Sequence, residues 1–290
     1  MQPNLPVGLL KFVDDKDDFL SKAVMGAFHL SSIEYFQKNG GEKVKDPYEG
    51  IIKLKDDTIS YKEIIEKYDN KAQAYITSFT LLYEDDFDTN GTIKKATLEK
   101  LCQTNNGEKR PAVIYNYETF IGHMETLISN NNTYYRYNHK YNLGNKIVKD
   151  EYDNEVVKDN HKHYTPIYTI YGNKVKYSDE PFRENKPDII KGVEKSQDSE
   201  NGVEFVTKYL KRALLIKNTL YSTQNEYRVL VTAFNLIPDE FSESIDLKAP
   251  LIPTKVNPSG TTRKNNHKSI GKVIANEDLD KLNKLDFLEI

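Results

Sequence analysis

Two segments of this chain have the composition of buried β-strands, although they lie far apart in the sequence. Residues 72–82 (AQAYITSFTLL) and 226–236 (EYRVLVTAFNL) are rich in β-branched and aromatic side chains, which favour extended, packed backbone. Residues 60–69 and 203–217 instead place apolar side chains at helical spacing. The combination predicts an α+β fold.

Shorter elements are expected between and around these segments. Short strands are predicted over residues 9–13, 26–33 and 112–115. Ser60 with Glu63 matches the reciprocal pattern that caps a helix start, and Asn116 and Asn276 are placed to cap helices over residues 117–128 and 277–288.

The region from residue 133 to 200 differs in character, since tyrosine, lysine and asparagine dominate it. Within it, Gly172-Asn173 is a two-residue signal for a hairpin turn, and residues 184–201 are polar enough to predict rapid protease cleavage. We therefore predict four parts: residues 1–132 as the N-terminal half of a core domain, 133–200 as a polar, tyrosine-rich insertion with a β-hairpin, 201–236 as the C-terminal half of the core, and 237–290 as a proline-punctuated extension that ends in a helix.

Composition excludes several classes of protein. The longest apolar runs, such as residues 213–216, are far shorter than the roughly 20 residues of a membrane-spanning helix, and the first ten residues do not resemble a secretory signal. The single cysteine, Cys102, cannot form an internal disulfide, which is typical of the reducing cytoplasm. A net charge of −3 does not favour nucleic acid as a partner, so we expect a protein target or complex instead. Together with the single cysteine and the absence of a signal-like start, this predicts a cytoplasmic protein.

Glu226 is the first candidate for chemistry, because it stands where a loop enters the late strand. A carboxylate there can stabilise the oxocarbenium-like state through which a ribosyl bond breaks. Gln224, two residues earlier, can orient the acceptor of the ribosyl group. The alternative is structural: Glu226 forms an ion pair with Arg228 or with a lysine.

Hydroxyl and basic side chains on the earlier strands are the other candidates. Ser78 and Thr80 share one face of the strand over residues 72–82, where Ser78 can hold a carboxylate and Thr80 can contact a cofactor. Lys11 and His29 can bind its phosphates. Taken singly, each of the four residues is more typical of an ordinary structural role.

Other motifs are weaker. His139, His161 and His163 lack the further ligands that a zinc site needs, so we expect no metal. The basic residues between 263 and 272 are typical of a solvated tail. The glycine-rich fingerprints of P-loop and Rossmann proteins are absent from the sequence.

Five short motifs occur in an order that resembles a family of uncharacterised bacterial and phage proteins, which typically carry an LYKY-like first strand, an NDPFE-like turn, a CFS-like strand and an E-x-E-W/Y-R strand. The corresponding motifs here are Leu10-Lys11-Phe12, Phe28-His29-Leu30-Ser31, Asp46-Pro47-Tyr48-Glu49, Ser78-Phe79-Thr80 and Glu226-Tyr227-Arg228. That family is similar to ADP-ribosyltransferases. The resemblance implies a split, mixed β-sheet with flanking helices and a basic, hydroxyl and glutamate triad around NAD. Two features depart from the pattern, because Lys11 replaces an arginine or histidine and the chain has no tryptophan.

Two functions follow from these observations. The first is an ADP-ribosyltransferase-like enzyme that cleaves NAD as its substrate and modifies a macromolecule, as a toxin or phage-defence effector. In that enzyme Glu226, Gln224 and Ser78 are catalytic, while Lys11, His29 and Thr80 bind NAD. The second is a non-catalytic phage or bacterial protein that inhibits a defence or host complex, with tyrosines of the insertion such as Tyr168 and Tyr171 as anchors.

Overall fold

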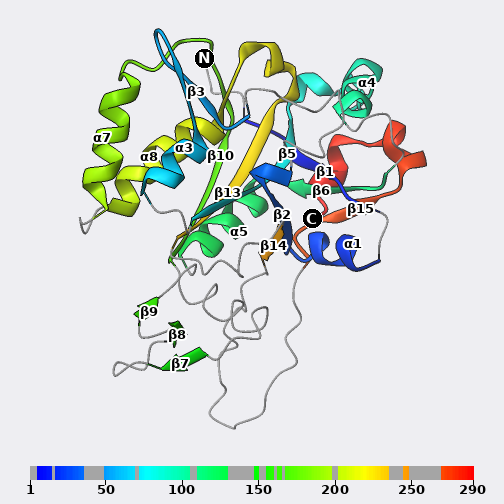
Figure 1. Cartoon of the computed structure of the whole chain (residues 1–290). Helices are drawn as coiled ribbons and strands as arrows, with labels where there is room; N and C mark the ends of the chain where they lie inside the picture. Colours follow the sequence, from blue (N-terminus) through cyan, green and yellow to red (C-terminus); the bar gives the residue numbers. More distant parts are fainter. Residues whose placement is uncertain are drawn as a thin grey trace. The chain divides into compact units, whose positions relative to one another are not determined.

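The protein is α+β, with a large open antiparallel sheet and flanking helices, as a computed structural model shows (Figure 1). The structure describes residues 5–14, 17–35, 49–68, 72–104, 110–129, 147–149, 155–159, 162–164, 167–197, 202–234, 244–247 and 269–290. The chain divides into two compact units. Unit 1 comprises Met1–His29, Phe79–Ser129 and Asp246–Ile290, and unit 2 comprises Leu30–Ser78 and Asn130–Ile245.

Strand β5 (Gln73–Leu82) is the strand predicted over residues 72–82. Its residues 73–78 belong to unit 2 and its residues 79–82 to unit 1. Along the strand, Thr77 and Phe79 are buried while Ser78 and Thr80 are half-buried. This alternation confirms that Ser78 and Thr80 share a face.

Unit 1 is built on antiparallel strands in the order β5, β1, β6 and β15. These are β1 (Gly8–Phe12), β6 (Ala112–Asn116) and β15 (Lys272–Ile274). The unit also contains α1 (Asp17–Val24), η1 (Glu84–Asp86), α4 (Lys95–Thr104), α5 (Tyr117–Ser129), η4 (Asn276–Lys281) and η5 (Lys284–Phe287). As predicted, Asn116 caps α5, since its side chain accepts a hydrogen bond from the Thr119 amide at 3.0 Å.

An aromatic cluster forms part of the core of unit 1. Phe28, Phe79, Tyr115 and Phe120 are all buried. Their ring centroids lie 4.8–6.1 Å apart, mostly in edge-to-face contact, an arrangement that stabilises beyond simple burial. Because Phe28 and Phe79 come from two of the resemblance motifs, these motifs contribute apolar side chains to the core of unit 1.

Gly8 leaves no room for a side chain. A Cβ there would overlap the Phe287 ring and lie 2.6 Å from the Tyr115 carbonyl oxygen. We expect Gly8→Ala to lower the free energy of unfolding by about 1–3 kcal/mol, because the core must shift. Gly122→Ala is the matched control, since Gly122 is exposed in α5 with nothing within 4 Å of an added Cβ. It should instead stabilise by about 0.5–1 kcal/mol. Urea unfolding measures both, and effects of the same sign would contradict the packing described here.

Unit 2 pairs β10 (Ile167–Lys174) with β13 (Glu226–Phe234) along eight residue pairs, and pairs Ser31 and Ser32 of β2 (Phe28–Ser32) with β5. Smaller elements are the hairpin of β3 (Ile51–Lys53) and β4 (Thr58–Ser60), the parallel pair β11 (Lys176–Tyr177) and β12 (Ile216–Lys217), and the three-stranded sheet of β7 (Ile147–Lys149), β8 (Glu155–Asp159) and β9 (Lys162–Tyr164). Strand β14 (Ser244–Leu247), which pairs with β2, begins in unit 2 and ends in unit 1.

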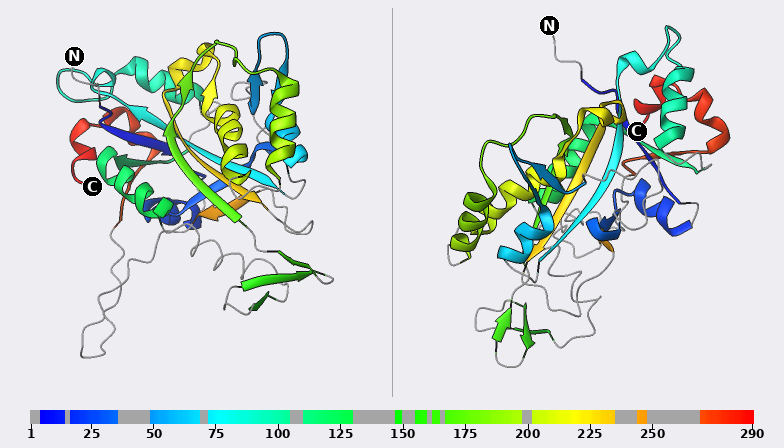
Figure 2. Two further views of the ribbon diagram at one scale, coloured as in Figure 1. Left: turned by 90° about the vertical axis from the view of Figure 1, so that its left-hand side faces the viewer. Right: turned by 45° about the horizontal axis from the view of Figure 1, so that its top comes forward.

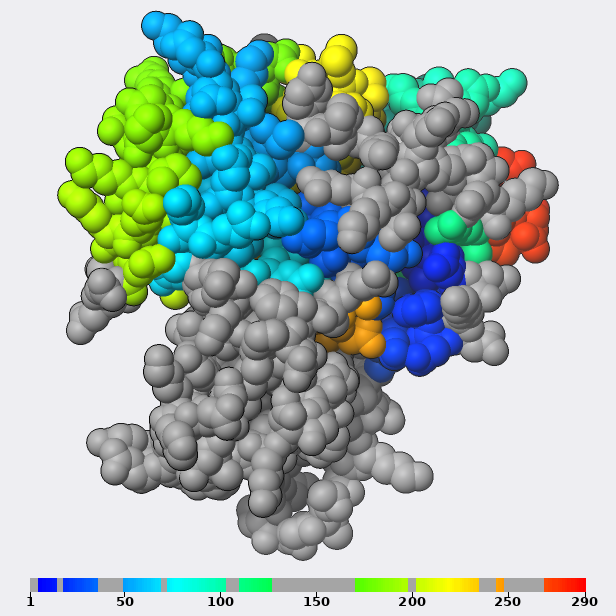
Figure 3. Space-filling view, in the orientation of Figure 1, coloured from blue at the N-terminus to red at the C-terminus, as the bar shows by residue number. Residues whose placement is uncertain are grey.

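Three helices cover one face of β13 and of the first part of β5 (Figure 2). They are α3 (Tyr61–Tyr68), α7 (Lys186–Ser196) and α8 (Gly202–Leu215). The predicted capping pattern at α3 is confirmed, because the Ser60 amide donates to Glu63 at 2.9 Å and the Glu63 amide donates to the Ser60 hydroxyl at 3.1 Å. Helices α3 and α7 lie side by side next to the β3–β4 hairpin (Figure 3).

Several sequence predictions are corrected. Gly172-Asn173 is not a turn, because β10 continues through both residues and pairs with β13. Residues 186–196, predicted as part of a mobile segment, form α7, which buries Ile189 and Val193. The closing helix is two short 3-10 helices, η4 and η5, and Ala275 replaces Asn276 at the first N-cap. In the large sheet, the pairings β1–β5, β1–β6, β6–β15, β2–β5 and β10–β13 are antiparallel, where the resemblance implied a mixed sheet.

No helix in the described part of the chain combines the length and apolar character that crossing a membrane requires.

Candidate functional site

Glu226 is the first residue of β13 and follows a sharp turn. The 3-10 helix η2 (Thr219–Gln224) ends at Asn225, whose φ of 46° lies in the left-handed region. Asparagine tolerates this region better than most residues. The turn leads the chain into β13. Because alternate residues of a strand share a face, Glu226, Arg228 and Leu230 lie on the same face of β13. Arg228 and Leu230 contact α8 and its neighbours from that face.

The Glu226 carboxylate is buried and has three donors. Its Oε1 accepts a hydrogen bond from Lys217 Nζ at 2.7 Å, while Oε2 accepts from Arg228 Nε at 2.9 Å and from Ser78 Oγ at 3.2 Å. The Glu226 side chain is only 10% exposed. Lys217 Nζ also donates to Gln224 Oε1 at 2.9 Å. The Lys217 ammonium therefore bonds both Glu226 and Gln224, two of the residues predicted to be catalytic.

Arg228 extends this network to a second carboxylate. Its two terminal nitrogens donate to Glu49 at 2.5 and 2.9 Å, and one of them also donates to the Leu214 carbonyl at 2.7 Å. The fork-to-fork contact with Glu49 is the geometry in which arginine binds carboxylates most strongly. Two acids and two bases therefore compensate one another in the interior of unit 2.

The pKa of Glu226 reflects these neighbours. Burial raises it, but the positive charges of Arg228 and Lys217, with their hydrogen bonds, outweigh burial and lower the pKa to about 2. Near pH 7 this carboxyl is ionised, which makes it a poor general acid or base. It is suited to accept hydrogen bonds or to stabilise positive charge.

The structure brings Ser78, Gln224 and Glu226 together, although Ser78 lies 148 positions from Glu226. It also shows the structural alternative from the sequence, because Glu226 pairs with Arg228 and with a lysine. That lysine is buried, with 6% of its side chain exposed. The same contacts of Glu226 are therefore consistent with a catalytic role and with a structural ion pair.

The three residues predicted to bind NAD belong to unit 1. Lys11 Nζ lies 5.0 Å from the Phe79 ring centroid, and burial lowers the pKa of Lys11 to about 8, although Asp14 opposes this. His29 Nδ1 lies 2.9 Å from Asp246 Oδ1, and Thr80 pairs with Leu10 across β5 and β1. Their role in binding NAD stays a prediction.

Sequence reasoning missed Lys217 and assigned no role to Glu49. Lys217 is the last residue of the two-residue strand β12, two positions after α8 ends, and a lone lysine there carries no signal that it will be buried. Glu49 belongs to the acidic turn motif, but its contact with Arg228 joins residues 179 positions apart. Spacing along the chain cannot reveal such a pair.

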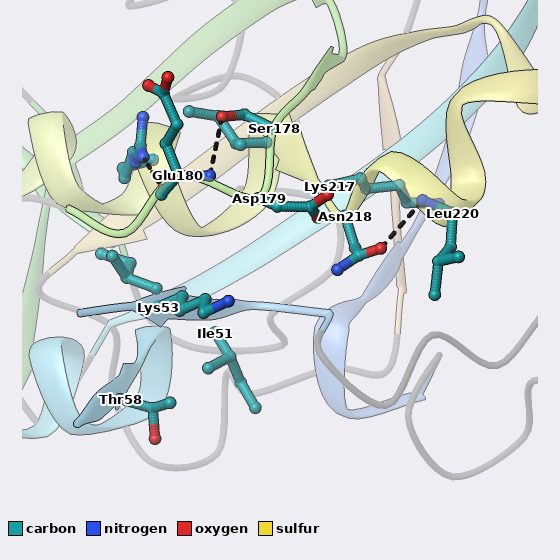
Figure 4. Close-up of a pocket in the computed structure, with 12 residues that line it drawn as sticks. Ile51, Lys53, Thr58, Ser178, Asp179, Glu180, Lys217, Asn218 and Leu220 are labelled. Atoms are coloured by element: carbon teal, nitrogen blue, oxygen red, sulfur yellow. Dashed lines mark hydrogen bonds between the residues drawn. The ribbon is translucent and has the colours of Figure 1, made fainter. Parts of the chain in front are cut away.

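A cavity of about 320 Å³ opens beside this network in unit 2 (Figure 4). Lys217 is both part of its lining and a partner of Glu226. The rest of the lining comes from the β3–β4 hairpin, the loop after β11, the end of α8 and the start of η2: Ile51, Ile52, Lys53, Thr58, Ser178, Asp179, Glu180, Arg212, Ile216, Asn218 and Leu220. The volume is at the lower end of the range for small-molecule sites.

Among the residues that the structure describes, no three histidine, cysteine or acidic side chains gather as metal ligands. His139, His161 and the side chain of His163 lie outside the described part. Of the basic stretch between 263 and 272, Lys272 is described, and it pairs with Asp286 at 2.9 Å and with Glu289 at 3.3 Å.

Comparison with known proteins found no matching family model, no matching curated protein and no matching solved structure.

Proposed function

We propose that unit 2 carries the centre of an ADP-ribosyl transfer site that uses NAD as substrate and a macromolecule as acceptor. The observation that carries the proposal is the hydrogen bond from Ser78 Oγ to Glu226 Oε2 at 3.2 Å. The resemblance to ADP-ribosyltransferases implies a strand hydroxyl beside the catalytic glutamate. The contact between Ser78 and Glu226 agrees with that arrangement and supports the proposal.

The proposed reaction breaks the bond between nicotinamide and the ribose carbon. The bond electrons leave with nicotinamide, which becomes neutral, and the ribose carbon develops positive charge. Ionised Glu226 stabilises that charge. A nucleophile of the acceptor then bonds to the carbon and loses its proton to water, with Gln224 orienting the acceptor.

The remaining bonding capacity of Glu226 fits this role. An ionised carboxylate has roughly four lone-pair positions, and Lys217, Arg228 and Ser78 take three of them among the described residues. The fourth is on Oε1, next to Lys217, which lines the cavity. A ribose hydroxyl is a donor of the right kind for that position.

The test is to incubate the purified chain with NAD labelled in the adenine half and a cell lysate. We expect free nicotinamide to accumulate and label to become attached to macromolecules. Heat-denatured protein is the control. If no nicotinamide is released at any protein concentration tested, the proposal is wrong.

The second candidate is a non-catalytic inhibitor of a defence or host complex, and the charge balance of the network favours it. Arg228 and Lys217 neutralise the charge that Glu226 needs to stabilise a cation, as expected of a structural ion-pair network. Of the two tyrosines predicted as anchors for this function, the side chain of Tyr168 lies outside the described part of the structure. Tyr171 packs against the core of unit 2 beneath Lys211, whose Nζ lies 3.5 Å from the ring centroid.

A further inference from the structure

The cavity of unit 2 has two walls that are fixed to their surroundings by backbone hydrogen bonds. On one side, the Phe182 amide donates to the Lys53 carbonyl at 2.7 Å, which joins the loop after β11 to the β3–β4 hairpin. On the other, the Ser178 amide donates to the Lys217 carbonyl at 2.9 Å, which joins the same loop to β12. The cavity is therefore largely preformed, as small-molecule sites usually are.

The two acidic residues of the lining differ in how their carboxylates are placed. Asp179 accepts hydrogen bonds from the amide of Thr219, at 3.1 Å, and from its hydroxyl. These bonds, with a smaller effect of the Lys53 charge, lower the pKa of Asp179. The Glu180 carboxylate points away from the hollow (Figure 4). The Asp179 carboxylate is therefore held by Thr219, and the Glu180 carboxylate does not enter the cavity.

Donor groups face the interior instead. The Lys53 ammonium and the Asn218 amide point toward one another across the hollow (Figure 4). The Asn218 Oδ1 already accepts from the Leu220 amide at 2.9 Å, so its NH₂ group is the part that faces the cavity. Arg212 adds a third donor group at the end of α8, where it also contacts the Glu180 carbonyl at 3.3 Å.

The remaining lining is apolar and reaches solvent at one edge. Ile51 and Ile216 are half-buried, and Leu220 is 84% exposed at the rim. A volume of about 320 Å³ is at the lower end of the range for small-molecule sites. It suits a mononucleotide or a smaller organic anion better than a whole dinucleotide.

We infer that this cavity is a binding site for a small organic anion of at most mononucleotide size. The anionic group meets Lys53 and the Asn218 amide, and the organic body packs against Ile51, Ile216 and Leu220. The site serves either function discussed above, because it needs neither NAD cleavage nor a protein partner. In an ADP-ribosyl transfer enzyme it would hold one half of NAD.

The experiment is calorimetric titration of the full chain with AMP and nicotinamide mononucleotide, with adenosine and inorganic phosphate as comparison ligands. We expect at least one mononucleotide to bind more tightly than both comparison ligands, because only mononucleotides combine the anion with an organic body. Affinity should fall as salt concentration rises. This readout requires no turnover, so it stays independent of the proposed function.

Lys53→Met should weaken mononucleotide binding on the order of 10-fold, since it removes one charge-assisted hydrogen bond. Lys55→Met is the matched control, because Lys55 is exposed on the same hairpin but outside the lining, and it should leave affinity unchanged. The inference is overturned if neither mononucleotide binds, if phosphate alone binds as tightly, or if the two lysine variants behave alike.

Discussion

Replacing Glu226 with glutamine is expected to slow nicotinamide release on the order of 10²-fold or more and to lower the free energy of unfolding by about 3–5 kcal/mol. The rate falls because a preorganised charge next to the developing cation is lost. Stability falls because Lys217 and Arg228 stay buried and, among the described residues, Glu49 is the one acid left to compensate them. The sequence placed Glu226 where a loop enters the late strand, and its pattern did not show that the carboxylate and its partners are buried.

A double variant separates the two effects. Glu226→Gln with Lys217→Met removes one acid and one base, so the Glu49–Arg228 pair remains neutral. We expect it to recover most of the lost stability, because no unpaired charge stays buried, while nicotinamide release stays low. Unfolding in urea and nicotinamide release under conditions where each variant is folded are the measurements. Release at the wild-type rate by the folded double variant would rule out a catalytic Glu226 and favour the non-catalytic function.

The same comparison has a predictable pH dependence. The pKa of Glu226 is about 2 in the folded chain against 4.5 as its ordinary value. When pH falls below 4.5 the unfolded chain takes up the proton first, so the stability contributed by ionised Glu226 is present above pH 4.5 and is lost as pH falls toward 2. This contribution is about 3 kcal/mol. The stability difference between wild type and Glu226→Gln should therefore shrink over that range, and a constant difference would contradict the pKa.

The elements that were predicted correctly are those in which the pattern of apolar residues within the segment is sufficient to specify a strand or a helix. Strands β5 and β13 are continuous in β-branched and aromatic residues, and helix α8 carries a wide apolar stripe. The prediction of a turn at Gly172-Asn173 was wrong because a two-residue signal reflects only local backbone preference. Pairing with β13 along eight residue pairs keeps β10 extended through both residues. Helix α7 was missed because it buries few apolar side chains among many charged ones.

The candidate site was predictable only in part, for a related reason. Strand alternation placed Ser78 on a defined face of β5, and the resemblance, not spacing, placed it near Glu226. The charges that keep Glu226 ionised come from Lys217 in β12 and from Arg228 in β13 itself. Whether a carboxylate is free or neutralised depends on such tertiary contacts.

Replacing Arg228 with methionine is expected to lower the free energy of unfolding by about 3–5 kcal/mol. The variant removes the arginine that bonds both buried carboxylates, and among the described contacts Lys217 is then the cation near Glu49 and Glu226, at 3.8 and 2.7 Å; insufficiently compensated buried charge is costly. It also removes the donor to the Leu214 carbonyl. Arg110→Met is the matched control. Arg110 contacts Asp14 at 2.8 Å, but both side chains are substantially exposed, so its loss should cost about 0–1 kcal/mol.

Two further variants distinguish charge from geometry at Arg228. Arg228→Met with Glu49→Gln removes one base and one acid, so we expect it to be more stable than Arg228→Met alone despite carrying an additional substitution. Arg228→Lys keeps the charge but not the fork that bonds both Glu49 oxygens, so its loss should be intermediate. Urea unfolding at pH 7 ranks all four variants. If Arg228→Met costs no more than Arg110→Met, Arg228 is not the buried centre of the network, and the neutralisation of Glu226 that favours a non-catalytic function loses its main support.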